Sequence, residues 1–190
     1  MQIALHNLAT KHTNLLTSIR IARETGYAGI EIGSDKLQRY LDQGFTLESL
    51  RPLLAEVPPV GLSYVQDIER QEPQAYQALL AECEARCDLA QKIGCPMVQL
   101  LTGPLDPQGS YQGLAGKPWP EMRRLTAKNL AALAKIGKAH NVRFYLEAIT
   151  FTPLNRLDHQ LELLAETGCD NVGLVLDFFH LWNSGTNPDQ

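Results

Sequence analysis

A short joint between a helix-like run and an apolar, strand-like run occurs four times along this chain. The strand-like runs follow closely after Gly26, Gly94, Asn141 and Gly168. Glycine just past the end of a helix adopts a left-handed backbone conformation that other residues resist. A helix that leads directly into a short apolar strand is typical of βα units and of a parallel sheet. The repeated joint therefore predicts an α/β fold.

Hydrophobic periodicity divides the chain into six strands and five intervening helices. The strands are expected near residues 2–6, 28–33, 60–65, 97–102, 142–147 and 172–177. The helices are expected near residues 13–25, 46–56, 73–93, 119–140 and 155–167. The last helix is expected to begin with Asn155 as its cap and to bury Leu157, Leu161 and Leu164.

Two of the predicted strands finish on a carboxylate. Glu147 ends one run and Asp177 ends the next, 30 residues later, and His180 follows shortly afterwards. Consecutive parallel strands would place these groups at the same edge of a sheet. Carboxylate oxygens and an imidazole together suit a divalent metal ion. We therefore interpret Glu147 and Asp177 as metal ligands, with His180 beside them.

Alternation along the strands distinguishes between two kinds of parallel sheet. Phe144 and Leu146 share one face of their strand, which leaves Glu147 on the other face. The same alternation places one polar side chain of each of five strands on a common face: His6, Glu31, Gln99, Glu147 and Asp177. A barrel with an active-site mouth requires such an inner polar face. A doubly wound sheet has helices on both faces and accommodates the pattern less well.

The predicted barrel is incomplete. A TIM barrel has eight strands and about 250 residues, whereas this chain has 190 residues and stops after its sixth predicted strand. We therefore expect one TIM-barrel domain over residues 1–190 with about six βα units, lacking the C-terminal strands. It could be a fragment, a gene truncation, or a chain that completes its sheet with a partner copy as a homo-oligomer.

Composition excludes some classes of protein. The net charge of −4 gives no general attraction to nucleic acid. No run is long and apolar enough to span a bilayer, and the N-terminus has no basic region followed by an apolar one. We therefore expect a cytoplasmic protein without a membrane partner. The four cysteines are expected to be small buried residues, because no close CxxC pair is present.

At these motifs the chain resembles the xylose isomerase-like TIM barrels, a group of sugar-phosphate isomerases and epimerases that also contains endonuclease IV. The resemblance covers nearly the whole chain. It is carried by the segments Gly26–Glu31, Ala90–Gly94, Leu146–Glu147 and Leu176–His180. The resemblance implies that Glu147 and Asp177 are two of four ligands of a divalent ion (Mn, Mg, Co or Zn), that His180 holds a substrate oxygen, and that Glu147 also moves a proton. The other ligands and a second acid/base carboxylate would lie beyond residue 190.

Further residues are candidates for binding a small carbohydrate-like substrate. His6 and Gln99 stand near strand ends, and Glu31 either contacts substrate or pairs with Arg143, the pair being favoured. The glycine- and proline-rich stretch 103–120 is either a lid or disordered. In a lid, Tyr111 and Trp119 would cover the substrate.

Three functions remain open from the sequence. The first is metal-dependent isomerisation or epimerisation of a small sugar, polyol ketone or hydroxy-keto acid through an enediolate. The second is a truncated barrel that serves as a non-catalytic binding or assembly module. The third is a DNA-repair endonuclease, which would need histidines near the ends of the third and fourth strands, where this chain has Ser63, Tyr64, Gln99, Leu101 and Thr102.

Overall fold

A computed structural model describes residues 2–104 and 111–187. Its single sheet contains six strands in the order of the chain, and every neighbouring pair is parallel. The strands are β1 (Ala4–Leu5), β2 (Gly29–Ile32), β3 (Pro59–Val65), β4 (Met97–Leu101), β5 (Arg143–Glu147) and β6 (Val172–Val175). All six lie at the positions that the sequence predicts.

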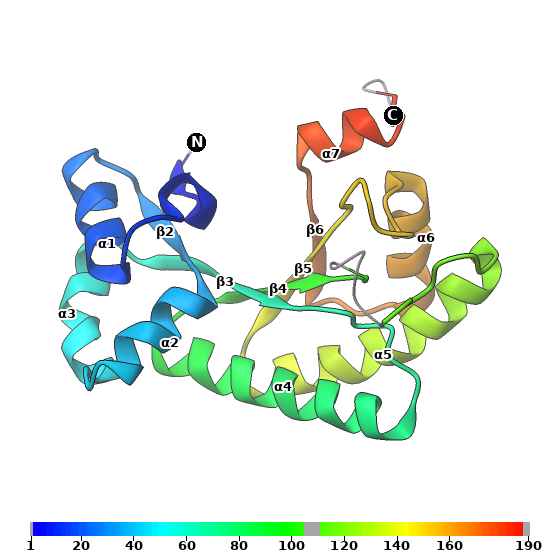
Figure 1. The fold of residues 1–190 in the computed structure, drawn as a ribbon, viewed down its shortest axis with the longest axis horizontal. Helices are drawn as coiled ribbons and strands as arrows, with labels where there is room; N and C mark the ends of the chain where they lie inside the picture. Colours follow the sequence, from blue (N-terminus) through cyan, green and yellow to red (C-terminus); the bar gives the residue numbers. More distant parts are fainter. Residues whose placement is uncertain (1, 105–110, 188–190) are drawn as a thin grey trace.

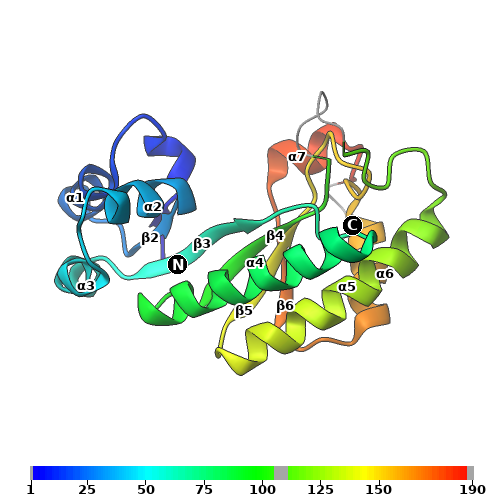
Figure 2. The same cartoon turned by 60° about the horizontal axis from the view of Figure 1, so that its bottom comes forward.

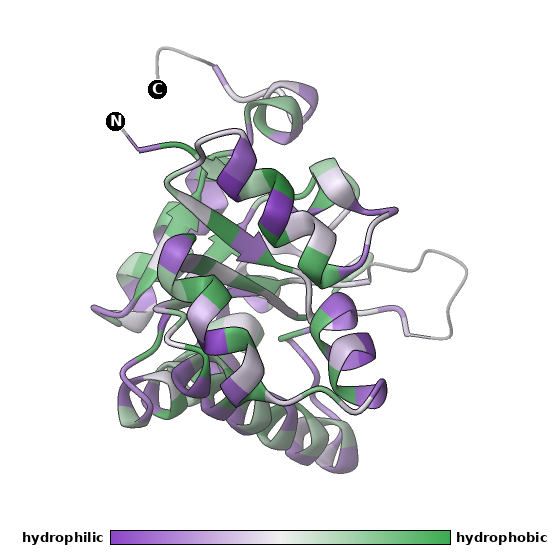
Figure 3. Ribbon diagram, turned by 90° about the vertical axis from the view of Figure 1, so that its left-hand side faces the viewer, coloured by the Kyte–Doolittle hydropathy of each residue, from purple (hydrophilic) through white to green (hydrophobic). Residues whose placement is uncertain are grey.

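Helices follow the strands in the pattern of repeated βα units. They are α1 (Leu15–Glu24), α2 (Ser34–Asp42), α3 (Leu47–Glu56), α4 (Pro73–Lys92), α5 (Trp119–Ala139), α6 (Leu157–Thr167) and α7 (Phe178–Asn183), with a 3-10 turn η1 at Asn7–Thr10. Helices α4 and α5 lie side by side along one face of the curved sheet (Figures 1 and 2). Hydrophobic and hydrophilic residues alternate along the helices, as expected for amphipathic helices that cover a sheet (Figure 3).

The sheet is an open barrel, as the sequence predicts. Strands β1 and β6 are its two edges, and they are not paired with each other. The beginning of the chain and α7 therefore stand on either side of an open gap (Figure 1). No described helix is long and apolar enough to cross a membrane.

The side chains of β5 alternate between the two faces as predicted. Phe144 and Leu146 are buried beneath the helices, and Phe144 packs so closely on Gly137 of α5 that a Cβ there would lie 2.5 Å from the ring. Tyr145 and Glu147 are only partly buried on the opposite, inner face. Tyr145 reaches across that face to Gly61 of β3, whose missing side chain leaves room for the phenol ring.

The structure corrects several predicted helical features. Helices α2 and α7 are absent from the sequence prediction. Helix α6 begins after Arg156, not after Asn155, whose side-chain amide donates instead to the carbonyl of Thr150 at 2.7 Å. Its buried residues are Gln160 and Leu163, because the Gln160 amide donates to carbonyl oxygens of the loop before the helix. Leu161 is 53% exposed.

The cysteines are free thiols. Cys83, Cys87 and Cys95 are buried, as expected, and Cys169 is partly buried. They therefore act as small apolar residues that pack within and beside α4 and α6.

The loops that follow β3 and β4 meet at a buried carboxylate. Glu69 is completely buried, and its Oε1 accepts a hydrogen bond from the backbone N–H of Gly103 at 2.9 Å. Burial raises the pKa of Glu69 to about 7, although the hydrogen bond from Gly103 opposes this increase.

This pKa predicts that Glu69 makes stability depend on pH. Unfolded Glu69 loses its proton near pH 4.5 but folded Glu69 near pH 7, so the free energy of unfolding should fall as the pH rises between these values. In Glu69→Gln, the fall in the free energy of unfolding should be smaller by up to about 3 kcal/mol. Urea unfolding at pH 5 and pH 8 measures it, with Glu24→Gln, at an exposed residue at the end of α1, as the control. Equal pH dependence in wild type and Glu69→Gln would contradict the prediction.

Candidate metal centre

Two carboxylates and an imidazole come together at the carboxyl ends of β5 and β6. Glu147 is the last residue of β5, Asp177 lies two residues beyond β6, and His180 is in the first turn of α7. One ligand atom from each of the three residues lies within 4.8 Å of the other two. Adjacent parallel strands bring residues that are 30 positions apart in the chain to one place.

Asp177 has a structural role as well as a place in this cluster. Its Oδ1 accepts hydrogen bonds from the backbone N–H groups of Phe179 at 2.8 Å and of His180 at 3.3 Å. It is therefore the N-cap of α7. The cap holds the carboxylate in one orientation and places His180 directly beside it.

The imidazole of His180 is held at one edge and open at the other. Its Nδ1 lies 3.0 Å from the hydroxyl oxygen of Thr150, in the loop after β5. Its Nε2 faces Glu147, 3.9 Å from Oε1. A partner on one ring nitrogen that orients the other is typical of histidines at metal and catalytic sites. The sequence analysis did not identify Thr150, because it lies in a loop with no recognisable motif.

Glu147 lies at the centre of the site. Its Oε2 accepts a hydrogen bond from the side-chain amide of Gln99, in β4, at 2.5 Å. Burial raises the pKa of Glu147, and nearby Asp177 raises it further, whereas His180 and the Gln99 bond lower it. A carboxylate with a raised pKa is a better proton acceptor near neutral pH.

A second pair lies on the same face at the other side of the open barrel. His6 Nε2 lies 3.3 Å from Glu31 Oε2. Burial raises the pKa of Glu31, His6 lowers it, and the charge of Glu147 raises it. The expected pair of Glu31 with Arg143 is wrong: the partner is His6, and Arg143 is exposed at the opposite end of β5.

Trp119 does not join the cluster. It is the first residue of α5, where its indole N–H donates to Glu162 of α6 at 2.7 Å and its ring stacks on His159 at a centroid distance of 3.9 Å. These contacts place Trp119 in the outer helical layer, and its expected role as a cover for substrate stays a prediction. Tyr111 lies beside buried Glu69, and the residues 105–110 of the expected lid lie outside the described part of the chain.

The donor set of the cluster suits a divalent cation. Glu147 and Asp177 supply hard carboxylate oxygens, and His180 supplies an imidazole nitrogen, a combination that binds Zn²⁺ and Mn²⁺. Three such groups leave coordination positions for further ligands. The geometry can therefore hold an ion beside a carboxylate that is able to accept a proton.

A model of the xylose isomerase-like TIM barrel matches residues 19–190. The chain belongs to this family. Its members that resemble the chain in sequence include an inosose isomerase of Halalkalibacterium halodurans, 27% identical over 189 residues, which cover 96% of this chain and 64% of the relative. A 3-dehydroshikimate dehydratase of Bacillus anthracis is 23% identical over 192 residues, which cover 99% of this chain and 65% of that enzyme.

A solved structure shares the fold. The crystal structure of the IolI protein with a zinc atom superimposes with a TM-score of 0.86 at 23% identity, covering 98% of this chain and 66% of that one. This xylose isomerase-like chain thus spans about two thirds of the length of the relatives that it matches.

Proposed function

We propose that this chain carries part of the active site of a divalent-metal-dependent isomerase or epimerase. In this proposal residues 1–190 form one TIM-barrel domain, and the substrate is a small sugar, polyol ketone or hydroxy-keto acid. The observation that carries the proposal is the cluster of Glu147, Asp177 and His180 at the carboxyl ends of β5 and β6. This is the end of a TIM barrel at which active sites lie.

In the proposal, Glu147 and Asp177 hold the ion, and His180 either completes its ligands or holds a substrate oxygen next to it. A bound divalent ion supplies Lewis-acid polarisation of the carbonyl and hydroxyl oxygens of the substrate. The relatives' names support a polyol ketone or a hydroxy-keto acid, since they are an inosose isomerase and a 3-dehydroshikimate dehydratase. The zinc atom in the IolI protein supports zinc as one candidate ion.

The reaction that fits these groups begins with removal of the proton on the carbon next to the carbonyl. Glu147 accepts this proton, and the burial that raises its pKa favours its protonated form. Gln99 donates to one oxygen of Glu147 and so fixes the orientation of the carboxylate. His180 lies close enough to share a substrate oxygen with this carboxylate. His6 and Glu31 line the opposite side of the same inner face.

A metal titration of the 190-residue chain tests the cluster. We expect one Zn²⁺ or Mn²⁺ ion to bind, weakly because only three ligands converge, and Asp177→Asn to weaken binding about tenfold or more. Asparagine is also a good N-cap, so loss of α7 would not explain this result. Asp170→Asn, two residues before β6, is the matched control. Equal binding by both variants would contradict the metal site.

Proton exchange tests the chemistry. With the metal present, a protein that contains this chain and a complete barrel should exchange the proton next to the carbonyl of an inosose for deuterium from D₂O, as followed by NMR. Exchange that survives complete removal of the metal, or no exchange with any hydroxy-ketone tested, would contradict the proposed function.

A further inference from the structure

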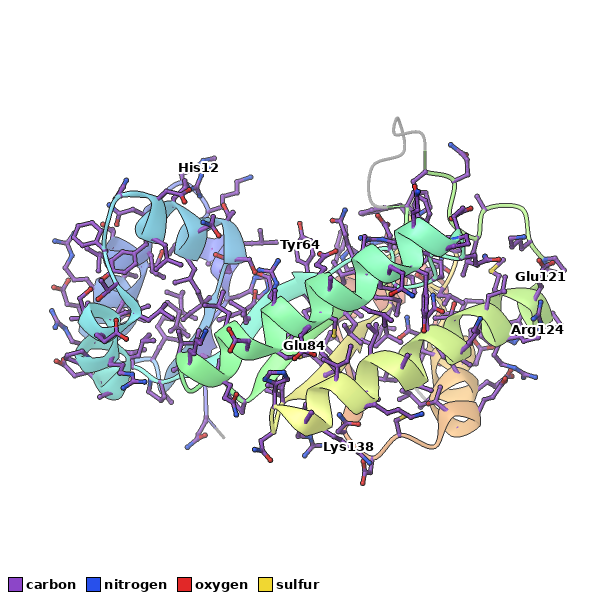
Figure 4. The ribbon with its side chains drawn as sticks, turned by 90° about the horizontal axis from the view of Figure 1, so that it is seen from below. His12, Tyr64, Glu84, Glu121, Arg124 and Lys138 are labelled. Atoms are coloured by element: carbon purple, nitrogen blue, oxygen red, sulfur yellow. The ribbon has the colours of Figure 1, made fainter. Side chains whose placement is uncertain are left out.

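A cleft of about 510 Å³ opens between η1, α2, β3 and α4, and none of its lining residues belongs to the metal cluster. Six charged residues line it: Lys11, Lys36, Arg70, Arg86, Asp35 and Glu82. Figure 4 shows Tyr64, another lining residue, projecting between the part of the chain that contains α1–α3 and helix α4. The cleft therefore lies outside the barrel, on the helical side of β3.

The two acidic residues of the cleft are already paired. Asp35 Oδ2 accepts from Arg39, one turn further along α2, at 2.6 Å. Glu82 Oε2 accepts from Arg70 at 3.1 Å. Neither carboxylate forms an ion pair with the remaining cations of the cleft among the described residues.

Lys36 brings a buried positive charge to the cleft. Its side chain is only 3% exposed. Its Nζ donates to three neutral oxygens: the Thr10 carbonyl at 2.6 Å, the Thr10 hydroxyl at 3.1 Å and the Ser18 hydroxyl at 2.9 Å. Burial lowers the pKa of Lys36, whereas the charge of Asp35 raises it, and a further anion nearby would stabilise the charge of Lys36.

Arg86 and Lys11 are the cations that remain available. Within the described part of the chain, neither forms a hydrogen bond or an ion pair. Arg86 is partly buried on α4, and burial lowers its pKa, although the charge of Glu82, one turn earlier on α4, raises it. A guanidinium that has lost part of its water and has no carboxylate partner can donate two parallel hydrogen bonds to an oxyanion. Lys11, just after η1, contributes a second donor to the cleft.

We propose that this cleft binds the phosphate group of a small molecule, or free phosphate. Lys36, Arg86 and Lys11 supply three positive charges with no carboxylate contact, in a chain whose net charge is −4. Like-charged groups that line a cleft concentrate their field there, and a phosphate dianion is the ligand that matches it. Asn7, Ser34 and Gln66 add polar groups along the same walls. The volume is within the usual range for small-molecule sites.

Titration calorimetry of the 190-residue chain tests this proposal with two probes, inorganic phosphate and glucose 6-phosphate, at constant ionic strength. We expect saturable binding of one equivalent. Arg86→Gln and Lys11→Gln should each weaken it, the former about tenfold because a charged hydrogen-bond donor is lost. Arg124→Gln removes the same charge at the far end of α5 and should leave binding unchanged (Figure 4).

The comparison of the probes distinguishes the two sources of phosphate. Tighter binding of glucose 6-phosphate would show that the cleft also holds the organic part, whereas equal binding would show recognition of phosphate alone; both support the proposal. The absence of saturable binding, or an equal effect of Arg124→Gln and Arg86→Gln, would overturn it. Circular dichroism of each variant confirms that the fold is retained. The result is independent of the metal site, since no metal is added.

Discussion

Glu147→Gln is expected to lower the rate of proton transfer by about 10²–10⁴-fold in a protein that contains this chain and a complete barrel. Glutamine keeps the shape of the side chain but cannot accept the proton. It also replaces an anionic metal ligand by a neutral one, so metal affinity should fall together with the rate. The affected quantities are the rate constant of deuterium exchange and the dissociation constant for Mn²⁺.

The position of Glu147 is the reason for so large an effect. It is within reach of Asp177 and His180, and the Gln99 amide holds it in place. No other described carboxylate belongs to the cluster with Asp177 and His180. Among the described residues, no further carboxylate beside the metal ligands could therefore accept the proton in place of Glu147.

Glu31→Gln is the matched control for this experiment. Glu31 is a partly buried carboxylate on the same inner face, and its pKa is also raised by burial. Its partner is His6, and it is not part of the cluster. We expect Glu31→Gln to leave Mn²⁺ affinity unchanged. Unchanged turnover in Glu147→Gln, or equal losses of metal affinity in both variants, would show that Glu147 does not have the proposed role.

Phe144→Ala is expected to lower the free energy of unfolding by about 3–5 kcal/mol. Phe144 is 1% exposed, in β5 between β4 and β6, and its ring packs against Gly137 of α5. Its neighbours on the adjacent strands are Val98 and Val172, both buried. Loss of the ring would leave a cavity between sheet and helix that these neighbours cannot fill. Urea unfolding followed by circular dichroism measures the loss.

Phe179→Ala provides the matched control, because Phe179 is 69% exposed on α7. Removing an exposed ring should change the free energy of unfolding by at most about 0.5 kcal/mol. If the two variants were equally stable, Phe144 would not lie in the core between β5 and α5. A smaller loss in Phe144→Ala with an unchanged urea dependence would show that α5 collapses onto the sheet.

The local pattern of the sequence was sufficient to predict the parallel sheet. An apolar run that follows a helix end has few alternatives to a buried strand. All six predicted strands are present in the described structure. Alternation also predicted that Phe144 faces the helices while Glu147 faces inward. Helix α2 could not be found in this way, since its buried residues are Lys36 and only two apolar residues, Leu37 and Tyr40.

Pairwise contacts required the tertiary structure. The amphipathic pattern of α6 indicated that Leu161 is buried, but Gln160 is buried instead and donates to the carbonyls of Glu147 and Leu154. Trp119 stands beside a glycine-rich loop in the sequence, yet it stacks on His159 of α6. Such contacts join residues that are distant in the chain, and a local pattern contains no information about which partner is within reach.

For the candidate site, the sequence by itself determined which groups end neighbouring strands: Glu147, Asp177 and, shortly after, His180. A period of two along each strand and the parallel order of the strands are local properties, and they are enough to direct these groups to one edge. Only the tertiary structure decided their partners. Gln99 of β4 donates to Glu147, Thr150 orients His180, and His6 pairs with Glu31. These pairings depend on the curvature of the sheet and the path of each loop, which arise when the whole chain packs.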